Sequence, residues 1–376
     1  MNYITLYHLI FVVKIKNNMR VCILGSGLSC LTLAKTLVNQ KIYVDVKVSG
    51  NFLKPSKSRT IGISKSNLEF FNKHVINIDK ITWKLRQIHI FSDSLKKEKL
   101  LNFENSKNQL FSILKNYELY NVLNKSLKKN KYFRIIKLKK NKKLFENYDI
   151  VIVTDYSSPI AKKYFNKQII KKYNSFAYTT IIEHKNIPND IATQIFTKNG
   201  PLAFLPVSNN KTSIVYSINN SNLFANEKIK DLIQNYNFKY KIKKINKIES
   251  FELKSFNLRS YYNNKFLAFG DLLHRIHPLA GQGFNMTIRD IKIFLNLVKN
   301  RVNLGLPIDS SINHEFENKT KHTNFIFSNG IDLIHEFFNL ETKIKNDTLS
   351  KSIQFLGKNS SINKVFTTLA DKGILI

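Results

Sequence analysis

The sequence has few cysteines and no long apolar run. Only Cys22 and Cys30 occur in 376 residues, and no spacing typical of a metal site accompanies them. We therefore expect two buried thiols in a reducing compartment, without a disulfide framework. The best apolar candidate, residues 4–13, is shorter than the roughly 18–20 residues that span a bilayer, and no small-residue cleavage site follows it. It predicts neither a membrane span nor a signal peptide.

Acidic residues are also scarce, since 26 Asp and Glu stand against 60 Lys and Arg and leave a formal net charge of +34. Such an excess favours partners such as nucleic acid or an anionic membrane. The lysines are scattered along the whole chain among many Asn, Ile, Phe and Tyr residues, as in proteins from AT-rich genomes. This scatter argues against a specific nucleic-acid site. Attraction to an acidic membrane surface is the more natural consequence of the charge.

The order of apolar patterns predicts an α/β protein. An apolar run over residues 19–24 ends at a glycine, helical spacing follows over 28–40, and a second strand-like run covers 43–48, which together make a βαβ unit. Strand-like segments dominate from about 170 to 250, and helical patterns from about 283 onward. With 43% hydrophobic residues, the chain can bury one large core or two fused ones.

A first glycine motif follows the first predicted strand and reads Gly25-Ser-Gly27-Leu-Ser-Cys30. Glycines in a turn that opens a helix let backbone N–H groups approach a pyrophosphate at the helix N-terminus. The pattern G-x-G-x-x-G is incomplete because Cys30 replaces its third glycine. The acid expected near residues 48–49 is also missing, and Asp45 lies too early to replace it. Alone, this motif is a weak signal of dinucleotide binding.

A second motif is more informative and reads Gly270-Asp271-Leu-Leu-His274-Arg-Ile-His277-Pro278-Leu-Ala-Gly281-Gln282-Gly283-Phe-Asn285. It follows a predicted strand and opens a helix. A carboxylate at position 271 can accept hydrogen bonds from ribityl hydroxyls, and Pro278 favours an extended entry into the turn. Gly281 and Gly283 allow a flat ligand to come close to the backbone. The helix start then offers N–H donors and partial positive charge to the anionic edge of a reduced flavin.

Two other interpretations of the second motif are weaker. His274 and His277 resemble a zinc pair, but no third Cys, His or acid stands at ligand spacing. A Pro- and Gly-rich loop that only caps a helix would not require so many special residues at fixed spacing.

The string GDLLHRIHPLAGQGFNMTIRD resembles the second FAD motif of the aromatic-ring hydroxylase superfamily, and within it the ubiquinone-biosynthesis hydroxylases. The strand-like segments 194–197, 200–206 and 213–216 are similar to the substrate-domain strands of that family. The segment 328–334 resembles its late helix. The segment Arg59-Thr-Ile-Gly-Ile-Ser64 resembles the family segment whose arginine lies beside the flavin. The resemblance extends over about residues 19–376.

The middle FAD motif departs from the family pattern. The family has Asp-Gly there, whereas this chain keeps Asp155 and has Tyr156 in place of the glycine; Lys162 stands where an arginine is expected. The resemblance implies a set of cofactor-binding residues that comprises Gly25, Gly27, Arg59, Asp155, Gly270, Asp271, Pro278, Gly281, Gln282, Gly283 and Asn285.

The resemblance implies a Rossmann-like FAD-binding domain, an inserted β-rich substrate domain and a helical C-terminal segment. The expected boundaries are 19–66, 100–168 and 252–300 for the FAD-binding domain, 67–99 and 169–251 for the substrate domain, and 301–376 for the helices. We interpret residues 1–18 as an extension or the product of an upstream start codon, because Met19 directly precedes the first strand.

The implied activity is monooxygenation, in which FAD, NAD(P)H and O₂ hydroxylate a polyprenylated phenol of ubiquinone biosynthesis. The flavin drives this chemistry, so no catalytic acid–base pair is required, and none is found. Such a lipid implies a cytoplasmic enzyme peripheral to the inner membrane, with an anionic membrane and other ubiquinone-biosynthesis proteins as partners. Two alternatives stay open: a flavin-poor scaffold of a biosynthetic complex, and a flavoprotein hydroxylase or reductase acting on another aromatic or lipid.

Overall fold

The computed structural model describes residues 19–48, 55–95, 98–104, 109–138, 144–219, 224–277, 281–344, 350–352, 354–355, 367–368 and 371–372. The extension that we predicted over residues 1–18 lies outside the described residues, and so does Pro278. In the described part of the chain, no helix is both long enough and apolar enough to cross a membrane.

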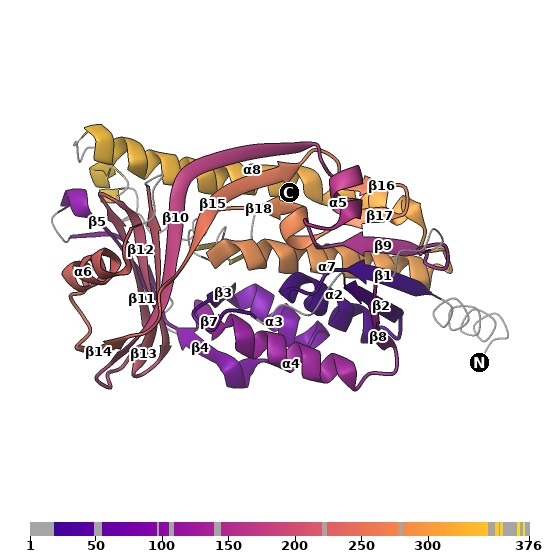
Figure 1. Cartoon of the computed structure of the whole chain (residues 1–376), viewed down its shortest axis with the longest axis horizontal. Helices are drawn as coiled ribbons and strands as arrows, with labels where there is room; N and C mark the ends of the chain where they lie inside the picture. Colours follow the sequence, from indigo (N-terminus) through magenta and orange to yellow (C-terminus); the bar gives the residue numbers. More distant parts are fainter. Residues whose placement is uncertain are drawn as a thin grey trace.

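A six-stranded sheet forms the centre of the first unit, on the right of Figure 1. Its central strands pair in parallel, and helix α2 (Leu28–Val38) connects the first two of them. This confirms the βαβ unit. The strand order is β16 (Tyr262–Asn263), β17 (Phe266–Ala268), β9 (Ile150–Val153), β1 (Arg20–Leu24), β2 (Tyr43–Val48), β8 (Phe133–Lys137).

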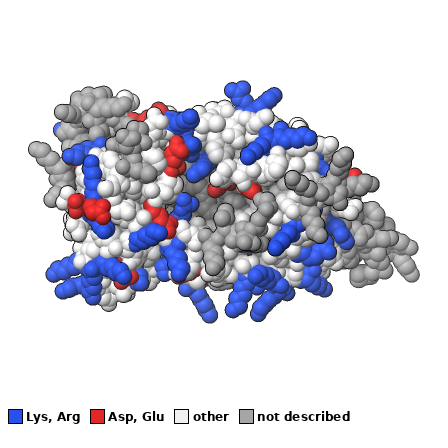
Figure 2. Space-filling view, in the orientation of Figure 1, with Lys and Arg blue, Asp and Glu red and all other residues white. Residues whose placement is uncertain are grey.

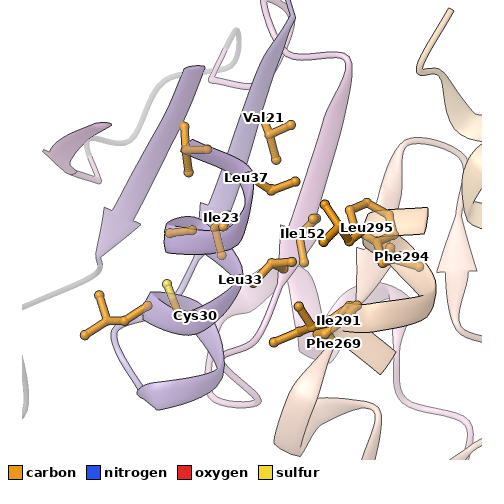
Figure 3. Packing of buried hydrophobic residues seen from close by; sticks show 14 of the residues in the cluster. Val21, Ile23, Cys30, Leu33, Leu37, Ile152, Phe269, Ile291, Phe294 and Leu295 are labelled. Atoms are coloured by element: carbon orange, nitrogen blue, oxygen red, sulfur yellow. The ribbon is translucent and has the colours of Figure 1, made fainter. Parts of the chain in front are cut away.

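The main hydrophobic core lies between this sheet and the helices α2, α4 (Asn116–Lys128) and α7 (Gln282–Asn303). Figure 3 shows Leu33 and Leu37 of α2 beside Ile152 of β9, with Ile291 and Phe294 of α7 close by. These apolar residues recur at three- and four-residue spacing, so each helix presents one apolar face. Burying each such side chain contributes roughly 1.5–3 kcal/mol, which holds α2 and α7 against the sheet.

A nine-stranded, mainly antiparallel sheet forms the second unit, on the left of Figure 1. Helix α6 (Asn226–Tyr236) packs Ile229 and Ile233 against one face of it. In Figure 1, β10 and β15 arch from this sheet towards the first unit. The strand order is β18 (His274–Arg275), β15 (Glu249–Leu258), β10 (Gln168–His184), β13 (Lys211–Ile218), β12 (Gly200–Ser208), β11 (Ile191–Thr197), β5 (Gln87–Ser92), β6 (Lys99–Glu104), with β14 (Ile242–Ile245) beside β10.

A third, smaller sheet bridges the two units. It contains β3 (Thr60–Ser64), β7 (Phe111–Lys115) and β4 (Thr82–Leu85), and helix α3 (Lys65–His74) follows β3. The aromatic residues Trp83 and Phe91, close in sequence, therefore lie in strands of different sheets. The chain leaves β4 and enters β5 in the large sheet at Arg86, whose backbone N–H donates to the carbonyl of Asp190.

Helix α8 (Ser310–Ile344) runs along both units, at the top of Figure 1. Its beginning enters the first core through Ile312 and Phe316. Near its end, the ring of Phe338 stacks on Phe196 of the large sheet at a centroid distance of 3.5 Å. This helix thus fixes the two units against each other. The predicted architecture, an α/β unit with an inserted β-rich unit and C-terminal helices, is confirmed.

We propose the domain division given above with two shifts. Strand β6 pairs with β5, so residues 99–104 go with the substrate domain. Helix α3 buries Leu68 and Phe71 in the first core, so its residues go with the FAD-binding domain. Strand pairing and shared cores are the physical basis of a domain.

Candidate active site

The two glycine motifs meet at the carboxyl edge of the parallel sheet, where β1, β9 and β17 end. A Cβ atom at Gly25 would lie 2.2 Å from Oγ1 of Thr154, and one at Gly270 would lie 2.6 Å from Cβ of Ser29. Both glycines also have positive φ angles, 140° and 62°. The carboxyl edge of an open α/β sheet is the usual place for a ligand. Glycine is required at both positions by the fold itself.

Gly27 has a different role from Gly25. It is the N-cap of α2, and no described side chain caps this helix. Beyond its two chain neighbours, no described atom lies within 4 Å of a Cβ placed at Gly27. The first N–H groups of α2 therefore face an open cradle of the kind that binds phosphate.

Cys30 fits the position of the missing third glycine. Its Sγ lies 3.4 Å from the carbonyl oxygen of Gly25, and the residue is fully buried. Burial raises the pKa of its thiol well above the usual range. Both cysteines are free and buried, as predicted. A small apolar side chain is therefore accommodated where the family pattern has glycine.

The carboxylate of Asp45 is occupied by partners within the protein. It accepts hydrogen bonds from Nε of Arg134 at 2.8 Å and from the hydroxyl of Tyr148 at 2.7 Å. These contacts agree with the inference that Asp45 is not the acid expected at the end of the second strand.

Asp155 lies just beyond β9, near the first motif. Its Oδ1 accepts hydrogen bonds from the backbone N–H of Ser157 at 2.9 Å and from the Ser157 hydroxyl at 2.6 Å. The neighbouring Tyr156, which replaces the family's glycine, is 63% exposed. The tyrosine therefore projects from the surface and leaves the turn around Asp155 intact.

Arg59 and Asp271 approach each other from β3 and from the turn after β17. The guanidinium of Arg59 lies 4.1 Å above the ring of Phe251. Burial and the nearby Arg275 lower the pKa of Arg59, whereas Glu249 and Asp271 act in the opposite direction. Asp271 is exposed and has no side-chain hydrogen bond to any described residue. Its carboxylate is available to a ligand.

The start of α7 faces β3. Gly281 is the N-cap with φ of 63°, and a Cβ there would lie 3.3 Å from the backbone nitrogen of Gly62. No side chain caps this helix either. At Gly283 an added Cβ would meet only Ile276, at an ordinary 3.9 Å. Among the described residues, Gly62 restricts position 281, whereas no atom crowds position 283.

The side chains of Asn285 and Gln282 bind the protein itself. Nδ2 of Asn285 donates to the carbonyl of Gly62 at 3.0 Å, and Oδ1 accepts from the N–H of Ser64 at 3.0 Å. Oε1 of Gln282 accepts from Arg289 at 3.3 Å. Burial lowers the pKa of Arg289 to about 10. Of these two residues, both predicted to contact the cofactor, Asn285 holds the start of α7 against β3, whereas the side chain of Gln282 bonds within α7.

His274 forms a buried pair with Asp290 of α7. Its Nε2 lies 2.6 Å from Oδ2 of Asp290, and Oδ1 accepts a hydrogen bond from Asn324 of α8 at 3.0 Å. The ring of His277 packs edge-on against Tyr173 at a centroid distance of 5.0 Å. The two histidines thus have separate partners. Within the described residues, no group of three Cys, His or acidic residues is placed to hold a metal.

An apolar cavity of about 860 Å³ opens beside Arg59, Gly62 and Gly281. One wall is the face of the large sheet opposite α6, and the other consists of β7 and the middle of α8. The site residues predicted from the sequence do not lie on the wall that the large sheet forms. The alternation along β11 was the available signal, because Ala192, Gln194 and Phe196 all face the cavity. Its apolar lining includes Leu85, Ile88, Ile90, Leu100, Leu101, Phe103, Phe111, Ile113, Leu205, Val215, Ile326, Phe327, Ile331, Ile334, Phe337 and Phe338.

Comparisons with known proteins agree with this geometry. A family profile described as "FAD binding domain" matches residues 181–299. The chain is 29% identical over 171 residues to the 3-demethoxyubiquinol 3-hydroxylase of Escherichia coli, covering 42% of each protein. It is 24% identical over 216 residues to the mitochondrial ubiquinone biosynthesis monooxygenase COQ6 of Caenorhabditis elegans, covering 44% of this chain and 47% of that protein.

The alignments thus span less than half the length of these two relatives. The fold extends much further: p-nitrophenol 4-monooxygenase PnpA from Pseudomonas putida DLL-E4 superimposes with a TM-score of 0.75 at 11% identity, over 95% of this chain and 100% of that one. The chain therefore contains a match to an FAD binding domain, shares its fold with monooxygenases of known structure, and is similar over part of its length to ubiquinone-biosynthesis hydroxylases.

Proposed function

We propose that this protein is an FAD-dependent monooxygenase that uses NAD(P)H and O₂ to hydroxylate the ring of a polyprenylated phenol. The observation that carries this proposal is the position of the apolar cavity, which begins at Arg59 and Gly281 of the candidate flavin site and continues between the large sheet and α8. Its volume of about 860 Å³ suits a ligand larger than a simple phenol, because small-molecule sites range over about 300–1,000 Å³.

The residues at the carboxyl edge fit FAD. The open cradle at Gly27 and the uncapped start of α2 would hold the pyrophosphate, with Gly25 and Gly270 keeping the turns close together. The carboxylate of Asp271 would accept hydrogen bonds from the ribityl chain. Asp155 would support the neighbouring turn through its carboxylate, which accepts hydrogen bonds from Ser157.

The start of α7 and Arg59 would face the isoalloxazine ring system. The N–H groups after Gly281 carry partial positive charge, and the Arg59 guanidinium adds a full charge nearby. When bound, FAD supplies the redox chemistry, passing two electrons from NAD(P)H to O₂ so that one oxygen atom enters the substrate and the other becomes water. The chain itself positions the ring at the cavity entrance, and the apolar walls exclude water there.

A membrane surface is the proposed source of the substrate. Ile326, Leu333 and Ile334 of α8 line the cavity and are also 45–70% exposed, so an apolar helix face continues from the cavity to the outside. Figure 2 shows Lys and Arg side chains spread over the visible face, which is consistent with the net charge of +34. Basic residues attract anionic lipids, each contributing about 1 kcal/mol near the surface.

The test is turnover by purified, FAD-loaded protein with NADPH or NADH, a short-chain prenylated phenol and ¹⁸O₂. Mass spectrometry should find one ¹⁸O atom in the ring of the product. Oxidation of NAD(P)H that yields only hydrogen peroxide with every prenylated phenol would reject this substrate class. Protein that retains no FAD after reconstitution would instead support the scaffold interpretation.

A further inference from the structure

Among the polar side chains that line the cavity, most already have protein partners. The hydroxyl of Thr60 donates to Ser213 at 2.9 Å, and that of Thr179 lies 3.0 Å from the Ser58 hydroxyl. Gln282 is bonded to Arg289, as described above. These side chains therefore keep their hydrogen bonds whether or not a ligand fills the cavity.

Gln194 differs from them. It lies on β11 and lines the cavity, and its side-chain amide makes no hydrogen bond to any residue that the structure describes. Asn116, whose Oδ1 also lacks a partner among these residues, begins α4 directly beside Arg59 and so belongs to the flavin end. Gln194, by contrast, carries its amide on the wall that the large sheet forms, away from the Arg59 end of the cavity.

The surroundings of Gln194 are apolar and leave room. In the strand register it pairs with Ile90 of β5 on one side and with Ala203 of β12 on the other, and Val215 follows across the sheet. All three line the cavity. Ala192, two residues earlier on the same strand face, is small as well. The two alanines leave space for a flat group beside the amide.

Water can satisfy this amide only while the cavity holds water. A long apolar ligand expels that water, and a buried amide left without a partner weakens binding by roughly 10- to 100-fold. An amide both donates and accepts, so a hydroxyl or carbonyl oxygen on the ligand restores the lost bond. Sites that hydrogen-bond a ligand oxygen discriminate strongly against analogues that lack it.

We infer that Gln194 hydrogen-bonds an oxygen substituent on the ring of the prenylated substrate and so determines which ring carbon faces the flavin. This inference rests on the proposed function and adds a specificity-determining residue to it. The prenyl tail would then lie along the apolar part of the cavity, towards Phe196 and the α8 residues.

The test compares Gln194→Leu with wild-type protein, both loaded with FAD. The probes are 2-geranylphenol and geranylbenzene, which differ only in the ring hydroxyl, and binding is followed by the change in flavin absorbance. Wild-type protein should bind the phenol about 10- to 100-fold more tightly than the hydrocarbon. In Gln194→Leu this preference should disappear while the affinity for geranylbenzene stays the same or rises. The ratio of hydroxylated isomers should change as well.

Two controls separate this role from a structural one. The ligand-free Gln194→Leu protein should melt at the same or a higher temperature, because leucine suits the apolar wall. Gln87→Leu makes the same change on β5, where the side chain contacts His89 and does not line the cavity, and should leave the preference intact. If Gln194→Leu binds both ligands more weakly by the same factor, or melts at a lower temperature than wild type, the proposed role of Gln194 is rejected and the proposed function still stands. A wild-type protein that binds neither ligand removes the proposed substrate class and the inference with it.

Discussion

Gly281 faces Gly62 so closely that a Cβ atom at position 281 would lie 3.3 Å from the Gly62 backbone nitrogen. The left-handed conformation of Gly281 adds a second restriction. The start of α7 is therefore held against β3 by two glycines, and the side chain of Asn285 joins the same two backbones by hydrogen bonds to Gly62 and Gly281.

The first prediction contrasts two neighbouring glycines. Gly281→Ala should lower the free energy of unfolding by about 1–2 kcal/mol, because a Cβ is disfavoured in the left-handed region, and should reduce FAD retention. Gly283→Ala should leave the ligand-free fold as stable as wild type, since the added methyl makes only ordinary contact. Both are measured by urea denaturation and flavin content. Full flavin retention in Gly283→Ala would show that the ligand does not approach the backbone there.

The second prediction concerns the exposed carboxylate after β17. Asp271→Ala should weaken FAD binding about 10- to 100-fold, because a hydrogen bond to a charged group contributes roughly 1.5–3 kcal/mol. Its melting temperature without FAD should not change, since the side chain bonds to no other described residue. Titration of apoprotein with FAD measures the effect. Asp79→Ala, at an exposed acid in a distant turn, is the control and should bind FAD normally.

The third prediction tests the buried pair of His274 and Asp290. Asp290→Ala should lower the free energy of unfolding by about 3–5 kcal/mol, because it leaves one member of a buried pair alone. Glu315→Ala removes a partly exposed partner of Arg301 and should lower the free energy of unfolding by less than about 1 kcal/mol. Denaturant titrations of both variants give the comparison. Similar losses in the two proteins would contradict a structural role for the buried pair.

The fourth prediction is a dependence of stability on pH. Burial raises the pKa of Asp332, which accepts a hydrogen bond from the Tyr173 hydroxyl. The folded state then holds this proton more tightly than the unfolded state, so the contribution of Asp332 to stability falls as pH rises above about 4. Asp332→Asn should therefore be more stable than wild type at pH 7, by a margin that shrinks towards pH 4.

Asp309 supplies a control of opposite sign. Hydrogen bonds from Ser311 lower the pKa of Asp309. The contribution of the Asp309 carboxylate to the free energy of unfolding is therefore present above about pH 4 and is lost as the pH falls further. Asp309→Asn should accordingly be less stable than wild type at pH 7. Thermal melts at several pH values report both differences, and parallel curves for Asp332→Asn and wild type would refute the assignment.

The fifth prediction separates charge from apolar contact at the membrane. Binding to vesicles that contain an anionic lipid should decrease several-fold between low salt and 0.5 M salt, because exposed charges are screened within about 10 Å at 0.1 M. Leu333→Lys in α8 should weaken binding that remains at high salt, since it places a charge in the exposed apolar face. Sedimentation with vesicles measures both. If Leu333→Lys binds as well as wild type under both conditions, α8 is not the contact surface.

The sequence by itself determined the α/β class, the βαβ unit and the flavin-type entry to α7. These features depend on local patterns, namely strand and helix periodicity and glycines at turns, which are legible without knowledge of the fold. It also predicted that Asp45 lies too early to be a ligand, and in the structure the Asp45 carboxylate binds Arg134 and Tyr148.

Only the tertiary structure decided how those parts are used. It separated Gly281, which the backbone of β3 restricts, from Gly283, which no described residue crowds. It placed the side chain of Asn285, which was predicted to contact the cofactor, in hydrogen bonds with Gly62 and Ser64. It also assembled the cavity and left the Gln194 side chain on its wall without a hydrogen-bond partner among the described residues. Each of these facts depends on segments far apart in the chain, and their contacts arise only when the sheets and α8 pack together.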